Sequence, residues 1–340
     1  MKFRAANRFR RFFATLALGA TVLASAQAAA RDDFEAAFDN TLGTELRAPR
    51  SYSSIYSDAA ERRLALTANG DRGRIGVAAL DLSTGREFSI LGDQRFPMAS
   101  TSKIAIAATF LEGVDKGKWS LSDRFPLMVP VASRPFSSKI APVNAGTMLP
   151  AHELIELMIT RSSNPATDAL LAAVGGPDAV NRWVRNAGID NFQLSRDIAT
   201  LVRDDGEFDP ATYIDQRDSA TPQAMITLLA GIHQGRWLSA ESRRVIIGAM
   251  ERCRTGKRRI PALLPAGAYV AHKTGSLNNT SSDIGIIQMP DGRPVAIAIY
   301  VTGQGSRPAR EERIAQIARA LYDSYAAEGG STKNWVNARY

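Results

Sequence analysis

The chain has 340 residues, enough for one large domain or two modest ones, and its 45% hydrophobic and 22% charged residues are ordinary for a globular protein. This composition excludes a disordered chain and a collagen-like chain. The 42 basic and 34 acidic residues give a net charge of +8, which taken alone suggests a polyanionic partner such as a nucleic acid.

Much of the surplus charge lies at the start of the chain. Residues 1–28 carry five basic residues and no acidic one, with an apolar run from Phe12 to Leu23 and small residues around Ala26 and Ala28. This order of basic segment, apolar run and small-residue cleavage site predicts a secretory signal peptide. The run is shorter than the roughly 18 residues of a membrane span, so an uncleaved anchor is the less favoured alternative.

Export changes how the charge is interpreted. Cleavage after residue 28 leaves 37 basic residues against 34 acidic ones, so the mature chain carries +3. We expect a secreted or periplasmic protein that uses the general secretory route, and Arg10 and Arg11 leave the twin-arginine route open. We expect no nucleic-acid partner and no membrane association after the signal peptide is removed.

The rest of the chain alternates between strand-like and helix-like patterns. Residues 31–54 are polar and irregular, with one short helix expected at 33–38. In chain order the predicted elements are then a helix at 57–66, a hairpin at 75–82 and 86–91, helices at 103–111, 150–159 and 221–229, strands at 268–273, 283–289 and 295–301, and a helix at 309–325. The helix at 103–111 is apolar on nearly all sides, so it should be buried.

This order of strands, helices and strands predicts an α/β (α+β) fold. An antiparallel sheet flanked by helices would be built from both chain ends, with an all-helical domain inserted between them. The predicted divisions are the signal peptide 1–28, an N-terminal extension 29–54, the α/β domain 55–95 and 265–328, the helical domain 96–264, and a tail 329–340.

The strongest local signal is an S-x-x-K motif, Ser100 to Lys103, at the start of the apolar helix. Residues three apart share a helix face, so Lys103 can reach the Ser100 hydroxyl, and the helix N-terminus stabilises negative charge that develops there. A serine hydroxyl is a weak nucleophile until a base takes its proton, and a lysine in apolar surroundings can be neutral enough to do so. Of eight lysines, only Lys103 has a serine three residues before it.

Two further motifs follow: S-x-N at Ser162 to Asn164, after a helix, and K-T-G at Lys273 to Gly275, at the end of a strand. In this order the three motifs resemble the penicillin-recognising serine enzymes, the superfamily of serine β-lactamases and penicillin-binding proteins. The class A β-lactamase group is the most similar, because its R-D-T-T-T-P segment resembles residues 217–222 and the stretch before its K-T-G strand resembles residues 255–261. The resemblance covers about residues 75 to 325.

The resemblance implies a serine hydrolase that forms an acyl-enzyme. Ser100 would be the nucleophile and Lys103 its proton partner. The backbone N–H groups of Ser100 and Ser276 would form the oxyanion hole, whose donors act where charge develops. Ser162, with Lys273 beside it, would pass a proton to the departing nitrogen.

The resemblance also implies how substrate is bound. Asn164 would bind the side-chain amide of the substrate, and Thr274, Ser276 and Arg259 its carboxylate, a group that an arginine recognises well. Each of these residues has a plainer alternative. Lys273 and Arg259 could be solvated charges, the latter in a basic run at 252–259, and Asn164 could cap a turn.

The single cysteine, Cys253, and the three histidines carry less information. The cysteine cannot form an internal disulfide, and His152, His233 and His272 show no metal-ligand spacing, so we expect a partly buried, inert thiol and no metal or cofactor. A catalytic Cys-His pair is the alternative. His272 precedes Lys273 on a strand, so its side chain should point to the opposite face and pack in the core.

One part of the family pattern is absent. Class A β-lactamases hydrolyse the acyl-enzyme with a water that a glutamate activates, in an E-x-x-L-N segment, and this sequence lacks that segment. Arg196 and Asp218 resemble the ion pair that anchors the loop. Counting forward from Arg196 places Ile198 where the glutamate would be, whereas counting back from Asp218 places Asp205 there.

The candidate substitutes for this glutamate are carboxylates of the same segment. Asp197 and Asp205 are the leading candidates, with Asp204, Glu207 and Asp209 also available. The middle residue of the second motif differs too, because Ser163 stands where an aspartate is usual.

Three functions remain open on the sequence alone. The first is a β-lactam hydrolase. The second is a penicillin-binding D-alanyl-D-alanine carboxypeptidase with slow deacylation, because the missing glutamate controls turnover rather than acylation. The third is a secreted binding protein that has lost catalysis. We expect a monomer whose partner is a small β-lactam or a peptidoglycan stem peptide.

Overall fold

The computed structural model describes residues 59–337, so the predicted signal peptide, the N-terminal extension and the expected helix at 33–38 lie outside the described residues. Within residues 59–337, no helix is both long enough and apolar enough to cross a membrane.

A five-stranded antiparallel sheet lies at the centre of the described chain, in the order β2-β1-β10-β9-β8. Its strands are β1 (Ile75–Asp81), β2 (Glu87–Ile90), β8 (Val270–Leu277), β9 (Thr280–Gln288) and β10 (Pro294–Thr302). Strand β1 pairs with β10 along its whole length, from Ile75 opposite Val301 to Asp81 opposite Val295. The prediction that both chain ends build one sheet is confirmed.

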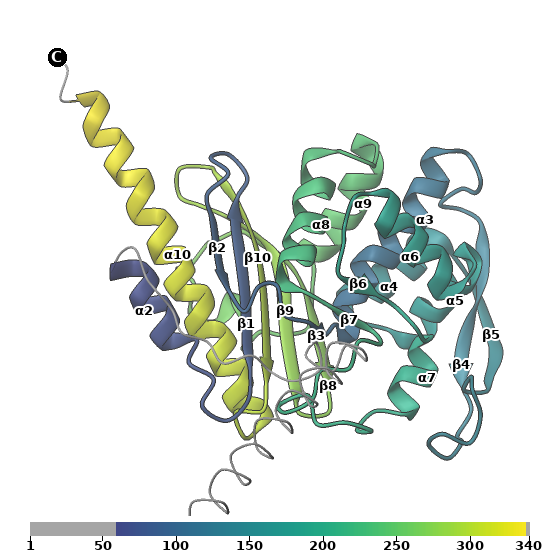
Figure 1. Ribbon diagram of the computed structural model, residues 1–340. Coiled ribbons are helices and arrows are strands. Elements are labelled where there is room, and N and C mark those ends of the chain that lie inside the picture. Colours follow the sequence, from purple (N-terminus) through teal and green to yellow (C-terminus); the bar gives the residue numbers. More distant parts are fainter. Residues whose placement is uncertain (1–58, 338–340) are drawn as a thin grey trace, which may run out of the picture. The chain divides into compact units, whose positions relative to one another are not determined.

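The two faces of the sheet contribute to different hydrophobic cores. Along β10, Ile297 and Ile299 pack on one side, against helices α2 (Ala59–Thr67) and α10 (Arg307–Asn337). Ala298 and Tyr300 pack on the other side, in the core of the helical region. Figure 1 shows α2 and α10 covering one face and the remaining helices lying beyond the other. Because both faces are covered, β10 is apolar at nearly every position rather than at alternate ones.

The inserted region is mainly helical, as predicted. Its helices are α3 (Lys103–Asp115), α4 (Ala151–Thr160), α5 (Asn164–Val174), α6 (Gly176–Asn186), α7 (Ile198–Arg203), α8 (Pro222–Gln234) and α9 (Ala240–Glu251), with 3₁₀ turns η2 (Ala99–Ser102) and η3 (Ile260–Leu263). Hydroxyl side chains begin several of them: Thr221 caps α8 and Ser239 caps α9, each accepting a bond from a backbone N–H of the first turn. Helix α3 is buried on nearly all sides, as expected for a central helix.

The structure differs from the sequence prediction in three respects. Helices α5, α6, α7 and α9 were not among the predicted elements, although the region was expected to be mainly helical. The inserted region also contains strands: a hairpin of β4 (Arg124–Pro130) and β5 (Val143–Pro150), and the short strands β3 (Phe96–Pro97), β6 (Phe192–Gln193) and β7 (Ser219–Ala220). The hairpin is largely exposed and contains several prolines, so it lacks the alternating pattern of a half-buried strand. Helix α10 also continues past the predicted end at Tyr325, because residues 326–328 are strong helix formers.

Candidate active site

Ser100 lies in the turn η2, directly before the buried helix α3. The preceding residue, Ala99, has a φ of +49°, a left-handed conformation that is costly for any residue with a Cβ. The K-T-G strand lies against this turn, since a Cβ added at Gly275 would be 2.7 Å from the carbonyl oxygen of Met98. Glycine is therefore needed at that position to bring β8 beside Ser100.

Lys103 is fully buried and makes three hydrogen bonds across to the second motif. Its Nζ donates to the carbonyl oxygen of Ser162 at 2.8 Å, to Ser162 Oγ at 3.3 Å and to Asn164 Oδ1 at 2.8 Å. No hydrogen bond joins Lys103 to the Ser100 hydroxyl, which is partly exposed and bonds to no side chain in the described part of the protein. The lysine amine of the first motif is therefore bonded to the second motif.

Lys273 also bonds the Ser162 hydroxyl. Its Nζ donates to Ser162 Oγ at 2.9 Å and to the carbonyl oxygen of Thr274 at 2.8 Å. Ser162 has a φ of +57°, so its backbone is held in a strained conformation between the two lysines. We call Lys103, Ser162, Asn164 and Lys273 the lysine–serine cluster.

Burial shifts the proton affinity of both lysines. Loss of solvation lowers the pKa of Lys103 well below its usual value, and the positive charge of Lys273 lowers it further, while Asp168 opposes these effects. Burial lowers the pKa of Lys273 to about 8. A lysine amine with a lowered pKa can take a proton near neutral pH, and a neighbouring lysine that stays charged can stabilise an anion.

The sequence analysis left open whether Asn164 binds substrate or caps a turn. Asn164 begins helix α5, and its side-chain oxygen binds Lys103. The capping contact belongs to Ser163, whose Oγ accepts a bond from the N–H of Ala166 at 3.3 Å. The alternative in which Asn164 merely caps a turn is therefore wrong.

The predicted carboxylate-binding residues lie together at the end of β8. Arg259 Nη2 donates to Ser276 Oγ at 2.6 Å and to Glu311 Oε1 at 3.1 Å, and its Nη1 donates to the carbonyl oxygens of Gly275 and Ser282 at 2.7 Å each. The Arg259 side chain is 1% exposed, and Lys273 is fully buried. Neither residue is a solvated charge, so that alternative is wrong for both.

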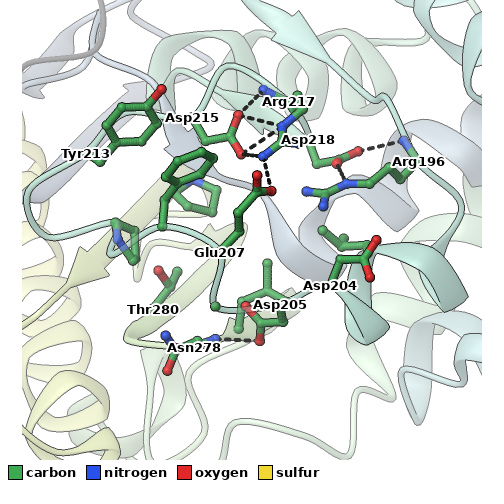
Figure 2. Close-up of a pocket in the computed structure, with 16 residues that line it drawn as sticks. Arg196, Asp204, Asp205, Glu207, Tyr213, Asp215, Arg217, Asp218, Asn278 and Thr280 are labelled. Atoms are coloured by element: carbon green, nitrogen blue, oxygen red, sulfur yellow. Dashed lines mark hydrogen bonds and ion pairs between the residues drawn. The ribbon is translucent and has the colours of Figure 1, made fainter. Parts of the chain in front are cut away.

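The segment from residue 196 to residue 218, the 196–218 loop, is anchored near this site. Arg196 Nε bonds Asp218 Oδ2 at 2.6 Å, and the carbonyl oxygen of Asp218 accepts the N–H of Met98. This ion pair between Arg196 and Asp218, drawn in Figure 2, therefore joins the loop to the strand that leads into Ser100.

The candidate carboxylates of the 196–218 loop all bind neighbours in or beside the loop. Asp197 caps α7 through the N–H of Thr200, Asp204 pairs with Arg203, Asp205 accepts the N–H of Asn278, Glu207 pairs with Arg217, and Asp209 accepts from Ala211 and Asn279. Figure 2 shows Asp205 turned to Asn278 and Glu207 turned to Arg217. None of the five forms a hydrogen bond to Ser100 or to the lysine–serine cluster within the described residues.

Asp168 is the carboxylate that the sequence analysis did not single out. Its Oδ1 and Oδ2 accept the N–H groups of Ile198 and Ala199 at 2.7 and 2.9 Å. Burial raises the pKa of the Asp168 carboxyl to about 6, although the two backbone hydrogen bonds lower it. Asp168 lies four residues after Asn164 on α5, so the sequence could have indicated that the two side chains share one face of the helix.

Ile198 occupies the position reached by counting forward from Arg196, where the family has its glutamate. Its side chain is buried and its N–H binds Asp168. The backbone N–H of Ile198 therefore fixes the 196–218 loop to Asp168 on helix α5.

His272 and Cys253 lie behind the K-T-G strand. His272 is buried, as expected, but its Nδ1 lies 2.9 Å from both carboxylate oxygens of Asp283. Cys253 is partly buried, and its Sγ lies 3.3 Å from Thr255 Oγ1. Among residues 59–337 no group of three His, Cys, Asp or Glu side chains could hold a metal ion.

Comparisons with known proteins show the family to which the chain belongs. The model of the β-lactamase enzyme family matches residues 59–325. The β-lactamase CTX-M-25 of Escherichia coli is 32% identical over 270 residues, which are 78% of this chain and 89% of that protein. The extended-spectrum β-lactamase PER-1 of Pseudomonas aeruginosa is 28% identical over 266 residues, 74% of this chain and 83% of that protein.

Solved structures give the same result. A β-lactamase from Chitinophaga pinensis is similar with a TM-score of 0.69 and 29% identity, over 79% of this chain and 100% of that chain. An ancestral class A β-lactamase is similar with a TM-score of 0.68 and 34% identity, over 78% of this chain and 99% of that chain. The chain therefore belongs to the β-lactamase enzyme family, as a serine enzyme of the class A type.

Proposed function

We propose that this protein is a β-lactam hydrolase that acts through an acyl-enzyme on Ser100. The observation that carries the proposal is that both lysine amines bond one hydroxyl: Ser162 Oγ lies 3.3 Å from Nζ of Lys103 and 2.9 Å from Nζ of Lys273. The relatives described above are themselves named β-lactamases, which supports the same substrate class.

In the proposed acylation, Ser100 Oγ attacks the lactam carbonyl and Lys103 takes its proton. Lys103 suits this task because its pKa lies well below that of a solvated lysine. Catalytic hydrogen bonds often form only when substrate is bound, so the amine can leave Asn164 for Ser100 in that complex. The N–H groups of Ser100 and Ser276 would hold the oxyanion, where charge develops.

The proton would then travel to the lactam nitrogen through Ser162. Its Oγ is within hydrogen-bond distance of both lysine amines, so it can accept a proton from one side while donating on the other. Arg259 and Ser276, which bond each other, with Thr274, would bind the substrate carboxylate, and Asn164 its amide. No cofactor or metal takes part in these steps as proposed.

A second candidate function is a D-alanyl-D-alanine carboxypeptidase with slow deacylation. The observation that favours it is the 196–218 loop, whose carboxylates bind their own neighbours and whose Ile198 stands at the place of the family glutamate. Without a base to activate water, the acyl-enzyme would persist. A secreted binding protein without catalysis is the third candidate, and the buried lysine–serine cluster argues against it.

We also propose that the protein acts outside the cytoplasm, as a monomer, after removal of residues 1–28. The basic and then apolar start of the sequence supports export. Mass spectrometry of the secreted protein would identify the cleavage site, and light scattering would give its oligomeric state.

The deciding experiment mixes the purified protein with a chromogenic β-lactam while following its mass. Continuous colour change supports the hydrolase, because each molecule of protein then opens many rings. One equivalent of a stable adduct supports the carboxypeptidase, and release of D-alanine from a stem peptide would establish it.

The control variants separate chemistry from folding. Ser100→Ala should give neither colour nor adduct. Ser102→Ala, in the same turn, removes only a hydroxyl that donates to the Ala99 carbonyl, and it should retain the adduct. An adduct on Ser100→Ala, or none on the unaltered chain, would contradict the acyl-enzyme on Ser100.

A further inference from the structure

The connection between β4 and β5, residues 131–142, is bonded to helix α7 and to the residue that follows it. We call this connection the hairpin tip. Thr200 Oγ1, in α7, accepts the N–H of Ala141 at 2.8 Å, and Oδ1 of Asp204, directly after α7, accepts the N–H of Phe136 at 2.9 Å. Figure 1 shows α7 beside the hairpin of β4 and β5. Two side chains of the 196–218 loop therefore hold backbone N–H groups of the tip.

Arg203 and Asp204 form an ion pair that adds two more bonds to the tip. Nε of Arg203 lies 2.7 Å from Asp204 Oδ1 and its Nη2 lies 2.8 Å from Oδ2, so the pair is bidentate. The same guanidinium donates to Ser138 Oγ at 2.8 Å and to the Ser138 carbonyl oxygen at 2.6 Å. The side chains of Arg203 and Asp204 are only 7% and 8% exposed. A planar arginine fork that is held on both sides has little freedom left, so the pair is a rigid link to the tip.

The start of α7 is attached to the helix that bears Asn164. The N–H groups of Ile198 and Ala199 bond the carboxylate of Asp168, which lies about one helical turn after Asn164 on α5. Asn164 in turn binds Lys103. The first residues of α7 are therefore fixed beside the part of the site where the substrate amide would bind.

The residue after the ion pair is attached to the end of the K-T-G strand. Asp205 Oδ2 accepts the N–H of Asn278 at 2.7 Å. Asn278 directly follows β8 and comes two residues after Ser276, whose hydroxyl binds Arg259. Residues 198–205 therefore connect the helix of Asn164 with the end of β8, and the hairpin tip is bonded to this connecting segment.

Phe136 in the tip has a conformation that burial of its ring does not explain. Its φ is +57°, a left-handed value that is costly for an aromatic residue, and the residue is 57% exposed. Its backbone is held instead by contacts such as the bond from its N–H to Asp204. Backbone strain of this kind is concentrated at ligand-binding and active sites, which points to a role for the tip in function.

We propose that Arg203 and Asp204 are positioning residues that fix the gap between the hairpin tip and the end of β8, and thereby limit the size of the acyl side chain that the enzyme accepts. This rests on the proposed function, in which Asn164 binds the substrate amide. The acyl side chain continues from that amide, so it would meet residues 198–205, with the tip on one side and the end of β8 on the other. A tip held by four hydrogen bonds cannot move aside for a bulky group without breaking some of them.

The first test compares two penicillins that share one bicyclic nucleus. Benzylpenicillin carries a flexible phenylacetyl group, whereas methicillin carries a dimethoxybenzoyl group that is branched beside the amide. The second-order rate constant of acylation is measured for each on the full chain, by mass. In Arg203→Met the ratio of the benzylpenicillin constant to the methicillin constant should fall about tenfold, because the released tip admits the larger group. An unchanged ratio in the folded variant would overturn the proposal.

The ratio separates positioning from a general loss of structure, which would slow both penicillins alike. Arg203→Lys keeps the charge but not the fork that reaches both Asp204 and Ser138, so it should restore the ratio only in part. The matched control is Arg217→Met, which removes an arginine that bonds carboxylates of the loop itself. Its ratio should stay within about twofold of the unaltered value. A fall as large as that of Arg203→Met would overturn the assignment to Arg203.

A second variant leaves the ion pair intact. Thr200→Val keeps the shape of the side chain and removes the acceptor of the Ala141 N–H. One bond to the tip is lost, so the ratio should fall about threefold in the same direction. If Arg203→Met does not fold, this variant decides, and an unchanged ratio in Thr200→Val would then overturn the proposal.

Hydrogen exchange tests the attachment of the tip without any substrate. The amides of residues 136–141 should exchange faster in Arg203→Met and in Thr200→Val than in the unaltered protein, because their acceptors are released or lost. The amides of residues 270–277, in β8, should keep their rates. Equal exchange of residues 136–141 in all three proteins would show that these side chains do not hold the tip, and would overturn the proposal.

The two readouts also separate this proposal from the proposed function. Because acylation is measured rather than turnover, the ratio is defined for a hydrolase and for a slowly deacylating carboxypeptidase alike. If neither penicillin forms an adduct with the unaltered protein, the acyl-enzyme on Ser100 is wrong and the selection by size falls with it, whereas faster exchange in the variants would still establish that Arg203 holds the tip. Normal adducts with an unchanged ratio would overturn the selection by size alone.

Discussion

The lysine–serine cluster and the 196–218 loop both reach the turn of Ser100, and they differ in what their charged side chains contact. In the cluster, Lys103 and Lys273 converge on one hydroxyl, Ser162 Oγ, with no carboxylate bonded to either amine. In the loop, every candidate carboxylate is bonded to a neighbouring cation or backbone N–H. The proton transfer that we propose uses the first region, whereas the contacts of the second hold the loop in shape.

This difference separates the two halves of the proposed reaction. Acylation needs the groups of the cluster, which the three motifs bring together in the fold. Hydrolysis of the acyl-enzyme needs a base near a water, and the loop offers none that is free of other contacts. In the proposed reaction, the family resemblance therefore supplies the groups for acylation but no free carboxylate of the loop for deacylation.

The largest expected effect tests the cluster. Lys103→Met keeps the length of the side chain but removes the base, so acylation of Ser100 should slow by about 10² to 10⁴. Stopped-flow absorbance with a chromogenic β-lactam measures this rate. Lys116→Met, which removes a surface lysine paired with Glu112, should change it less than twofold. Acylation of Lys103→Met within tenfold of the unaltered rate would remove the basis for assigning proton transfer to the cluster.

A smaller effect tests the contact between the two regions. Asp168→Ala leaves the buried N–H groups of Ile198 and Ala199 without acceptors, which should lower the free energy of unfolding by about 1–3 kcal/mol. The substitution also removes the cost of burying the carboxylate, whose pKa is raised to about 6, and this offsets part of the loss. Urea denaturation measures it. Asp197→Ala, which removes only a helix cap, should cost about 1 kcal/mol. A stability of Asp168→Ala equal to that of the unaltered chain would show that the loop is not held from α5.

The pH dependence of acylation tests the charges of the cluster. The pKa of Lys273 is lowered to about 8, so its positive charge is lost as pH rises through that value. The rate with an anionic substrate should therefore fall about fivefold between pH 8 and pH 9. Lys273→Arg keeps its charge to much higher pH, so this decline should disappear, whatever the loss in absolute rate. A rate that stays flat to pH 10 in the unaltered protein would contradict the charged role of Lys273.

The smallest expected effect tests the loop. Asp205→Asn keeps an oxygen that accepts the N–H of Asn278 but removes the carboxylate, so turnover should change less than twofold. Steady-state kinetics with the same β-lactam checks this. A tenfold loss of deacylation would identify Asp205 as the base and would erase the distinction between the two regions.

The sequence predicted the sheet and the main helices because their signals are local. Strand β1, strand β10 and helix α3 carry long apolar patterns, and the hairpin turn and helix caps mark their ends. The hairpin of β4 and β5 was missed because an exposed ribbon with prolines has no such pattern.

The residues of the site also divide into those with a local sequence signal and those without one. Motif residues such as Lys103 and Lys273 stand at fixed places on a helix and a strand, so their convergence could be expected. Asp168 could not, because its partners lie thirty residues along the chain and are backbone N–H groups that carry no sequence signal. The contact of the His272 imidazole with the Asp283 carboxylate is likewise visible only once β8 and β9 are paired.

The pairing of β1 with β10 has a consequence for how the chain acquires its structure. The middle of the sheet joins residues near 78 to residues near 298, so its centre cannot close until the last strand has been synthesised. Contacts between such distant segments slow folding, because the long intervening chain must be ordered first. The sheet of a newly made chain therefore stays incomplete through most of its synthesis, and an incompletely folded chain is the state that a translocation channel for unfolded polypeptides accepts.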